Sequence, residues 1–331
     1  MIARVETIRF DFRSPAKTSR GTYTFKEHQF LIVQLLDALH VGEIAPMPQL
    51  SIESQEEVNT ELNDVLRFME REQKLPSSRD YSSSVRFAIE SIQRSMRNPD
   101  HSFRIPINGL VWMNDTEQMW ADTLLKVEQG FSTIKYKVGA NALHEELDLL
   151  RRVRDQFPSL TIRLDANGAF ASRDCLMILE KYAAFGIHSI EQPLAPGHRR
   201  ELAELVQRSP IPIALDEELI GVESMADMVS LLEEVRPHYV VLKPMLHGGF
   251  EHCDQWIRLA TNLGVRWWAT SYLESNIGLR ALGHWLSEYQ PTIPQGLGTG
   301  GIYRTNIDGP LNVEHGELVY DAHGKWNAPW K

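Results

Sequence analysis

Cysteine, long apolar runs and basic charge are all scarce in this chain of 331 residues. The two cysteines, Cys175 and Cys253, have neither metal-ligand spacing nor enough partners for a disulfide framework, which predicts a reducing compartment. No run of about 18 apolar residues occurs, and the N-terminal residues lack the apolar segment of a signal peptide. The formal net charge of −10 argues against nucleic acid or an anionic membrane as a partner. We therefore expect a soluble, cytoplasmic protein.

Short apolar segments of strand length recur between residues 134 and 271, and each ends in a charged or polar residue. These end residues are Lys135 and Lys137, Asp165, Glu191, Asp216, Lys243 and Ser271. From Lys137 onward they are 25 to 28 positions apart, roughly the length of a strand, a helix and two turns. The alternation predicts a parallel α/β fold, in which ligands bind beyond the carboxyl ends of the strands. We therefore expect an active site at this edge.

Residues 1–100 do not follow this rhythm and predict an α+β capping domain. Its expected elements are an antiparallel strand pair within 3–12 and 30–36 and two helices near 54–73 and 82–97. The first helix is preceded by Ser54, with Glu57 three positions later, which is a capping-box pattern. Residues 14–24 predict a long loop between the strands, either a lid over the active site or an ordinary exposed connection.

Residues 101–310 predict a (β/α)7β barrel of the TIM type, with its eighth strand at 292–296. A first strand begins at Ile105. The helix that follows is bracketed by Asp115 as its N-cap and by Gly130 after its last turn.

Two further stretches of the chain complete this expectation. Apolar residues at helical spacing predict helices near 142–156 and 222–235. Residues 311–331 predict a strand or hairpin that returns to the capping domain, with a turn at 321–324.

Three carboxylates follow three successive predicted strands: Asp165, Glu191 and Asp216. A barrel would bring them together, and three such groups cannot all stay ionised without a cation. Oxygen ligands suit Mg²⁺, and Mn²⁺ is a possible substitute. The alternative is that each acid pairs with a lysine or caps a helix. Glu217 or Glu218 could replace Asp216, but strand alternation places Glu217 on the opposite face, so Asp216 is preferred.

Lysines flank the acids on both sides. Lys135 and Lys137 share one face of their strand, and Lys243 would enter from about half a barrel away. An ammonium close to another ammonium and to a divalent cation has a lowered pKa, as a general base requires. A metal-bound substrate carboxylate between lysines is suited to removal of the proton α to that carboxylate. Alternatively, Lys135 is a salt-bridged lysine with no catalytic role.

Several of these motifs resemble the enolase superfamily, in its muconate-lactonizing subgroup. They are Lys-Tyr-Lys at 135–137, Asp165-Ala-Asn167, Glu191-Gln-Pro193, Asp216-Glu217, Lys-Pro at 243–244 and Ser-Val-Arg-Phe-Ala-Ile-Glu at 84–90. Within the subgroup, four further stretches are similar to the o-succinylbenzoate synthase family. These are Arg163-x-Asp165 and residues 243–249, 270–279 and 296–300.

This resemblance implies a metal-dependent hydro-lyase of menaquinone biosynthesis. The reaction would be syn-dehydration of 2-succinyl-6-hydroxy-2,4-cyclohexadiene-1-carboxylate to o-succinylbenzoate, through a metal-stabilised ene-diolate. Lys137 would be the base and then the acid, and Lys243 would stabilise the anion from the opposite face. The implied metal ligands are Asp165, Glu191 and Asp216, and the implied substrate-binding residues are Lys135, Arg163, Asn167, Ser271 and Gly298.

Other activities remain open. The same lysines could serve an N-acylamino acid racemase or a cycloisomerase, Lys243 could form a Schiff base as in an aldolase, or the barrel could bind a carboxylate without catalysis. Two differences in the motifs argue against other activities of the superfamily. Mandelate-racemase-type members carry a histidine where Ser271 stands, and dipeptide epimerases carry acids near the eighth strand, where residues 295–300 contain none.

Overall fold

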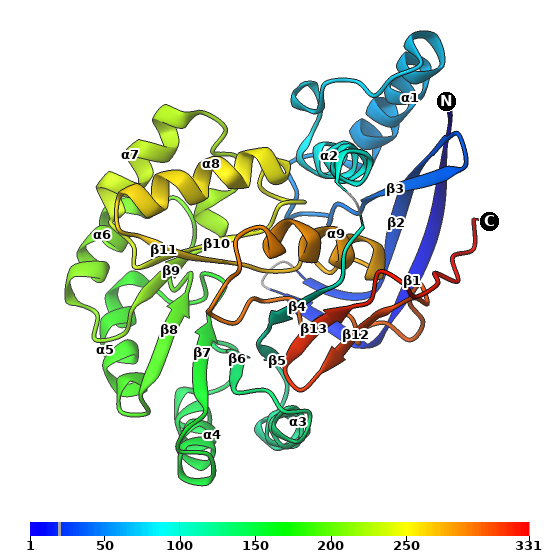
Figure 1. Ribbon diagram of the computed structural model, residues 1–331. Helices are drawn as coiled ribbons and strands as arrows, with labels where there is room; N and C mark the ends of the chain where they lie inside the picture. The colour runs from blue at the N-terminus through cyan, green and yellow to red at the C-terminus, as the bar shows by residue number, and fades with distance from the viewer. Residues whose placement is uncertain (19–20, 99, 331) are drawn as a thin grey trace.

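The computed structural model describes residues 1–18, 21–98 and 100–330. An antiparallel sheet of three long strands opens the chain, with two helices packed against it (Figure 1). These elements are β1 (Ile2–Thr18), β2 (Gly21–Leu35), β3 (Ala38–Ile44), α1 (Gln55–Glu72) and α2 (Ser83–Arg97). Apolar residues of β2, β3, α1 and α2 form a buried core of their own. We call this part of the molecule the cap.

The two predicted cap helices are confirmed, and so is the capping box at Ser54 and Glu57. The predicted long loop at 14–24 is wrong. The two strands continue through it, with a register shift between Asp11 and Ala16, and Thr18 still pairs with Gly21. Residues 19–20 lie outside the described residues. A role as a lid stays a prediction.

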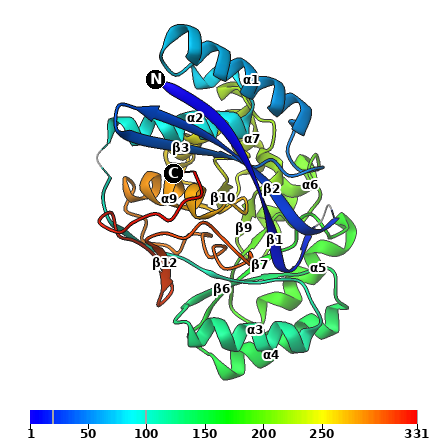
Figure 2. The same cartoon turned by 90° about the vertical axis from the view of Figure 1, so that its right-hand side faces the viewer.

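Seven parallel strands form the second sheet, in the order β11-β10-β9-β8-β7-β6-β5. They are β5 (Gly109–Val111), β6 (Thr133–Lys137), β7 (Thr161–Asp165), β8 (Ile187–Glu191), β9 (Ile213–Leu215), β10 (Tyr239–Leu242) and β11 (Arg266–Ala269). The helices lie outside these strands (Figure 2). They are α3 (Thr116–Glu128), α4 (Leu143–Gln156), α5 (Ser172–Ala183), α6 (Arg199–Arg208), α7 (Met225–Val235), α8 (Gly249–Asn262) and α9 (Asn276–Ser287). The predicted βα alternation is confirmed.

A short segment at the predicted eighth strand joins the two edges of this sheet. The N–H of Gly296 donates to Ala269 O at 2.7 Å, at the end of β11. On the other side, the N–H of Asn108 donates to Gln295 O at 2.9 Å, just before β5. Within the described residues the bridge consists of Gln295 and Gly296 rather than the whole of 292–296. We call the closed arrangement the ring.

The C-terminal residues form the predicted hairpin, but with a different turn and partner. Its strands are β12 (Leu311–Glu314) and β13 (Glu317–Tyr320), so the hairpin turn lies at 315–316; 321–324 forms a later turn. β13 pairs with β4 (Phe103–Pro106), so the first parallel strand begins at Gly109 rather than at Ile105. The final residues reach the cap, where the Trp330 ring lies 4.8 Å from that of Phe30.

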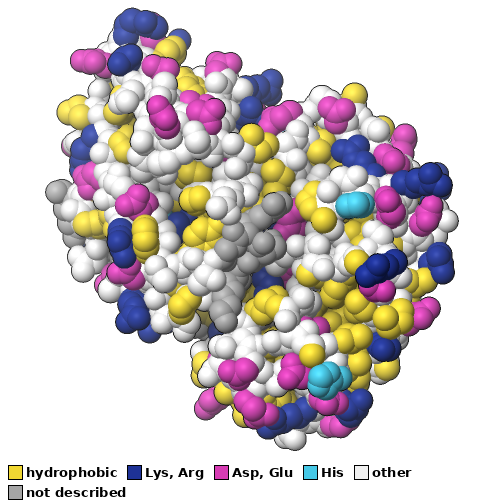
Figure 3. Space-filling model, turned by 180° about the vertical axis from the view of Figure 1, so that it is seen from behind, with side chains coloured by type: hydrophobic (Ala, Val, Ile, Leu, Met, Phe, Trp, Pro, Cys, Tyr) yellow, Lys and Arg dark blue, Asp and Glu magenta, His cyan; other side chains and the backbone are white. Residues whose placement is uncertain are grey.

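The surface carries charges of both signs. On the face in Figure 3, acidic and basic side chains are interspersed over two lobes, with a hollow between them. None of the helices within the described residues has the length and apolar character needed to span a membrane.

Candidate active site

Strand register places three charged ends side by side. Lys137 in β6 lies opposite Asp165 in β7, and Asp165 lies opposite Glu191 in β8. Lys135, two residues before Lys137, shares its face because side chains alternate along a strand. Both ammonium groups contact Asp165, so the prediction that they point to the same side is confirmed.

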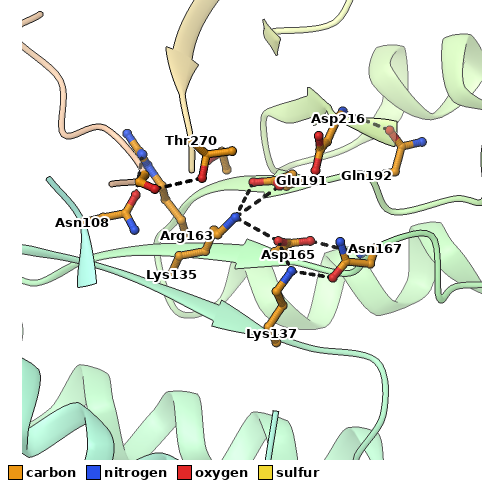
Figure 4. Close-up of polar contacts among 12 residues, drawn as sticks. Asn108, Lys135, Lys137, Arg163, Asp165, Asn167, Glu191, Gln192, Asp216 and Thr270 are labelled. Carbon is orange, nitrogen blue, oxygen red and sulfur yellow. Dashed lines mark hydrogen bonds and ion pairs between the residues drawn. The ribbon is translucent and has the colours of Figure 1, made fainter. Parts of the chain in front are cut away.

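Carboxylates hold the lysine pair (Figure 4). Lys135 Nζ donates to Asp165 Oδ2 at 2.9 Å and to Glu191 Oε2 at 3.0 Å. Lys137 Nζ donates to Asp165 Oδ2 and to Asn167 Oδ1, both at 2.6 Å. Burial lowers the pKa of Lys135, but the charges of Asp165 and Glu191 outweigh burial and raise the pKa above its ordinary value. The expectation of a lowered pKa, which depends on a divalent cation nearby, stays a prediction.

The pKa values of the three acids differ, because the two lysines lower that of Asp165 more than burial raises it. Burial raises the pKa of Asp165, but the two lysines outweigh it and hold that pKa well below its ordinary value. Burial raises the pKa of Glu191 to about 8, and the charge of Asp165 contributes to the rise. Burial also raises the pKa of Asp216. Carboxyl groups that are buried together and disfavour ionisation in this way are suited to sharing a cation.

The third acid lies at a turn rather than within a strand. β9 ends one residue before Asp216, and the 3₁₀ turn η2 (Glu217–Leu219) follows. Gln192 Oε1 accepts the N–H of Asp216 at 3.1 Å and so holds this turn (Figure 4). The Asp216 carboxylate pairs with Lys243. Gln192 was missed as a site residue, although it lies within the Glu-Gln-Pro motif.

Glu217 lies at the site, and the expectation that it faces the opposite side is wrong. Its Oε1 accepts a hydrogen bond from Asn167 Nδ2 at 2.8 Å, and its side chain lines the same cavity. Strand alternation does not apply because the strand has already ended. Glu218 is the residue that points elsewhere, toward the N–H of Gly197 and the guanidinium of Arg199.

The oxygen donors of the site fit a hard divalent cation. Asp216 Oδ1 and Glu217 Oε2 are buried without a hydrogen-bond partner among the described residues. Within the same part of the chain, no group of three His, Cys, Asp or Glu side chains is placed so that it could hold a metal ion. Lys135 and Lys243 instead contact the carboxylates. A cation would therefore have to displace ammonium contacts.

One cavity brings most of the predicted residues together. Residues of the ring that line it include Lys135, Lys137, Asp165, Asn167, Lys243, Ser271 and Gly298. The cap contributes Met47 and Leu50, which sequence reasoning missed because nothing near them in the chain carries reactive chemistry. Position 298 requires glycine because its backbone lies close to that of Asn108: a Cβ there would lie 2.6 Å from Asn108 O.

Two predicted substrate-binding residues have other partners. Arg163 is 1% exposed and lies two residues before Asp165, where its Nη1 donates to Asn108 Oδ1 at 3.1 Å. The Ser271 hydroxyl donates to Glu274 at 2.5 Å and accepts from Thr299 Oγ1 at 2.7 Å and from the N–H of Leu273. All three hydrogen-bonding positions of that hydroxyl are in use. Substrate contact by Arg163 or Ser271 stays a prediction.

Lysines and carboxylates at the carboxyl ends of a parallel ring, beneath an N-terminal α+β cap, define a protein of the enolase type. The family model described as Enolase C-terminal domain-like matches residues 119–325. The chain therefore belongs to the enolase superfamily, as the motifs predicted. Members of the superfamily use a divalent metal, typically Mg²⁺.

Among its relatives is o-succinylbenzoate synthase of Desulfotalea psychrophila, 35% identical over 93% of this chain and 95% of that protein. The crystal structure of MenC from the same organism superposes with a TM-score of 0.82, at 31% identity, over 96% of this chain and 99% of that chain. The L-Ala-D/L-Glu epimerase of Bacillus subtilis superposes with a TM-score of 0.84 over 98% and 96% of the two chains. It is only 19% identical and therefore supports the fold alone.

Proposed function

We propose that the protein is an o-succinylbenzoate synthase. It would carry out the Mg²⁺-dependent syn-dehydration of 2-succinyl-6-hydroxy-2,4-cyclohexadiene-1-carboxylate in menaquinone biosynthesis. The observation that carries the proposal is that Lys137 and Lys243 line one cavity together with Asp165 and Asn167. The similarity to the Desulfotalea enzyme over nearly the whole of both chains supports the choice of substrate.

Lys137 is the proposed base and acid. Its Nζ takes the proton α to the carboxylate and then returns it to the departing hydroxyl, which leaves as water. The C–H and C–O bonds break on the same face, and the product ring becomes aromatic. Asp165 and Asn167 orient the Lys137 ammonium, each at 2.6 Å.

Lys243 is the proposed electrostatic partner. It follows β10, whereas Lys137 ends β6, and four steps separate these strands in the sheet order. In a ring of about eight strands that separation corresponds to opposite sides. A cation at Lys243 would stabilise the negative charge that develops on the planar ring when Lys137 takes the proton.

The proposed metal ligands are Asp165, Glu191 and Asp216, with Mg²⁺ as the cation and Mn²⁺ as a substitute. The bound cation would supply Lewis-acid stabilisation of negative charge on the substrate carboxylate. Lys135 holds Asp165 and Glu191 close together, and a bound cation would take over these contacts with the two carboxylates. Substrate contacts are proposed for Lys135, Arg163, Asn167, Ser271 and Gly298.

We also propose the domain division and the location. Residues 1–100, joined by 311–331, form the capping domain, and 101–310 form a (β/α)7β barrel of the TIM type in which Gln295 and Gly296 take the place of an eighth strand. The separate apolar core of the cap supports the first boundary. The partner is a small carboxylate substrate rather than nucleic acid or a membrane. A cytoplasmic location agrees with two buried free cysteines.

The test is ultraviolet monitoring of the cyclohexadiene substrate with the full-length protein, with Mg²⁺ and after treatment with EDTA. We expect conversion to the aromatic product only with the cation. An N-acylamino acid racemase would instead exchange solvent deuterium into its own substrate and leave the cyclohexadiene intact. Conversion that persists without a divalent cation, together with borohydride trapping of substrate on Lys243, would support Schiff-base chemistry and overturn the proposal.

A further inference from the structure

Two carboxylates of the cap are buried against the ring. Glu43, in β3, is 1% exposed, and Glu90, in α2, is 2% exposed. A buried carboxylate is costly unless its oxygens receive hydrogen bonds. Each of these finds its donors at the N-terminus of a ring helix, far away in the chain.

Glu43 binds the start of α9. Its Oε1 accepts the N–H of Ser275 at 2.8 Å, and its Oε2 accepts the N–H of Gly278 at 2.8 Å and the hydroxyl of Ser275 at 2.5 Å. His28, in the neighbouring strand of the cap, contacts Glu43 Oε1 at 2.6 Å. Burial raises the pKa of Glu43, but His28 and Ser275 outweigh burial and lower it, so the carboxylate stays charged at the positive end of the helix.

Glu90 binds the start of α8 in the same manner. Its Oε2 accepts the N–H of Phe250 at 2.6 Å and the N–H of Glu251 at 3.0 Å. The N-cap residue of α8 is Gly248, which has no side chain to supply these bonds. Ser78, also in the cap, donates to Glu90 Oε1 at 2.9 Å. The cap therefore supplies what the sequence of α8 lacks.

A glycine in the first turn of each helix makes room for the carboxylate. A Cβ on Gly249 would lie 2.6 Å from Glu90 Oε2. A Cβ on Gly278 would lie 3.0 Å from Glu43 Oε2 and 2.6 Å from Glu274 Cβ. Two separate helices thus show the same pairing of a cap carboxylate with a helix-start glycine.

Both helices begin just after loops that carry proposed site residues. Lys243 precedes α8, and backbone bonds tie its carbonyl to the N–H of Leu246 at 2.8 Å and of His247 at 2.7 Å. Ser271 precedes α9, and Glu274 accepts both its hydroxyl and the N–H of Tyr272 at 2.7 Å. Such short, internally bonded loops transmit a displacement of the helix start to the side chain at the strand end.

We propose that Glu43 and Glu90 are positioning residues of the active site. Each fixes one ring helix from the cap, so that the seating of the cap sets the positions of Ser271 and Lys243. Glu43 acts on the substrate-binding wall, and Glu90 acts on the lysine opposite the base. The proposal rests on the proposed function only for the roles of Ser271 and Lys243.

The experiment combines hydrogen–deuterium exchange of the full-length protein with steady-state kinetics. Glu43→Gln should speed amide exchange across 270–278 about tenfold and leave 243–251 unchanged, and Glu90→Gln should do the reverse. In the kinetics, Glu43→Gln should raise KM about tenfold with little change in kcat, whereas Glu90→Gln should lower kcat about tenfold with little change in KM.

Glu61→Gln is the matched control. Glu61 accepts the N–H of Ser82 at 3.1 Å and caps α2 entirely within the cap, so its loss should lower the melting temperature without changing either loop or the kinetics. If a glutamine variant fails to fold, Ser78→Ala and His28→Gln loosen the two carboxylates from the cap side and should give smaller changes in the same directions.

Two results would overturn the proposal. One is faster exchange only at the capped amides, with 270–273 and 243–247 as protected as in the wild type. The other is wild-type KM and kcat in both folded variants. If the wild type does not dehydrate the cyclohexadiene at all, the proposed function fails, and the exchange measurement still decides whether the cap positions the loops.

Discussion

The two sides of the ring are held by different means. On the side of β6, β7 and β8, lysines and carboxylates contact one another, and the parallel register of three strands aligns them. On the side of β10 and β11, the loops after the strands depend on carboxylates of the cap. Lys26 of the cap adds a further bond, to Tyr272 O at 2.6 Å.

The two sides of the ring therefore differ in which parts of the molecule must assemble to form them. The charged side needs only the ring to assemble, because its contacts are made among β6, β7 and β8 and the residues that follow them. The opposite side requires the ring and the cap to dock correctly. Substitutions on the first side should therefore change proton transfer and metal binding directly, and those on the second should act through the docking of the cap, on substrate binding at Ser271 and on kcat through Lys243.

The largest effect is expected on the charged side. Lys137→Ala should lower kcat roughly a thousandfold, because it removes the proposed base. The fold should survive, since Lys135 still pairs with Asp165. Initial rates and a thermal melt measure the two outcomes. Lys181→Ala, at an exposed position on α5, is the control, and a rate like wild type in Lys137→Ala would remove the base assignment.

The second largest effect is expected on metal binding, which a substitution on the charged side should remove and one on the opposite side should not. Mg²⁺ at a hundredfold excess over Kd should stabilise the wild type by about 2.7 kcal/mol, measured as a rise in melting temperature. Asp165→Asn should lose this rise because it removes a proposed ligand. Ser271→Ala, on the other side of the ring, should keep it. A rise of equal size in all three proteins would place the cation elsewhere.

On the side held by the cap, a small substitution should have an intermediate effect. Gly278→Ala should cost about 2 kcal/mol of stability, because its Cβ would crowd Glu43 and Glu274. Gly301→Ala is the control, since a Cβ there meets nothing within 4 Å. Chemical denaturation measures both, and equal stabilities would mean that the contact between cap and helix adapts at little cost.

The last comparison concerns pH. Burial raises the pKa of Glu274 from 4.5 to about 7, so its contribution to stability is present below the unfolded-state pKa and is lost as pH rises through about 7. Burial also disfavours the charged form of Lys26 and lowers its pKa to about 8. The stability of the wild type relative to Glu274→Gln should therefore fall between pH 5 and pH 7. A difference independent of pH would contradict this assignment.

The charged side could be predicted from the sequence, because each of its residues is marked by the short strand that precedes it. Each of Asp165 and Glu191 ends an apolar strand, and parallel strands bring their ends together. The prediction for Glu217 was wrong because it assumed strand alternation, whereas the chain leaves the strand before Asp216 and forms a 3₁₀ turn. Apolar periodicity does not reveal where a buried strand ends.

Contacts between the cap and the ring could not be predicted from the sequence. Glu43 and its partner Ser275 are 232 residues apart, and no pattern in the sequence links the two positions. The hairpin of β12 and β13 was expected from its own residues, but nothing in those residues specifies its pairing with β4, about 200 positions earlier in the chain. A loop was predicted at 14–24 because this stretch is polar and contains Pro15 and Gly21. In the structure, a register shift after Asp11 accommodates it, and β1 extends to Thr18.

The in-register row of Lys137, Asp165 and Glu191 restricts how this chain can change length. Inserting or deleting a single residue within β6, β7 or β8 would rotate every following side chain to the other face of the sheet and remove one charge from the row. The connections at the amino ends of the strands, such as 157–160 between α4 and β7, lie outside this constraint. Length variation among descendants of this sequence should therefore accumulate there, while the three strands keep a constant residue count.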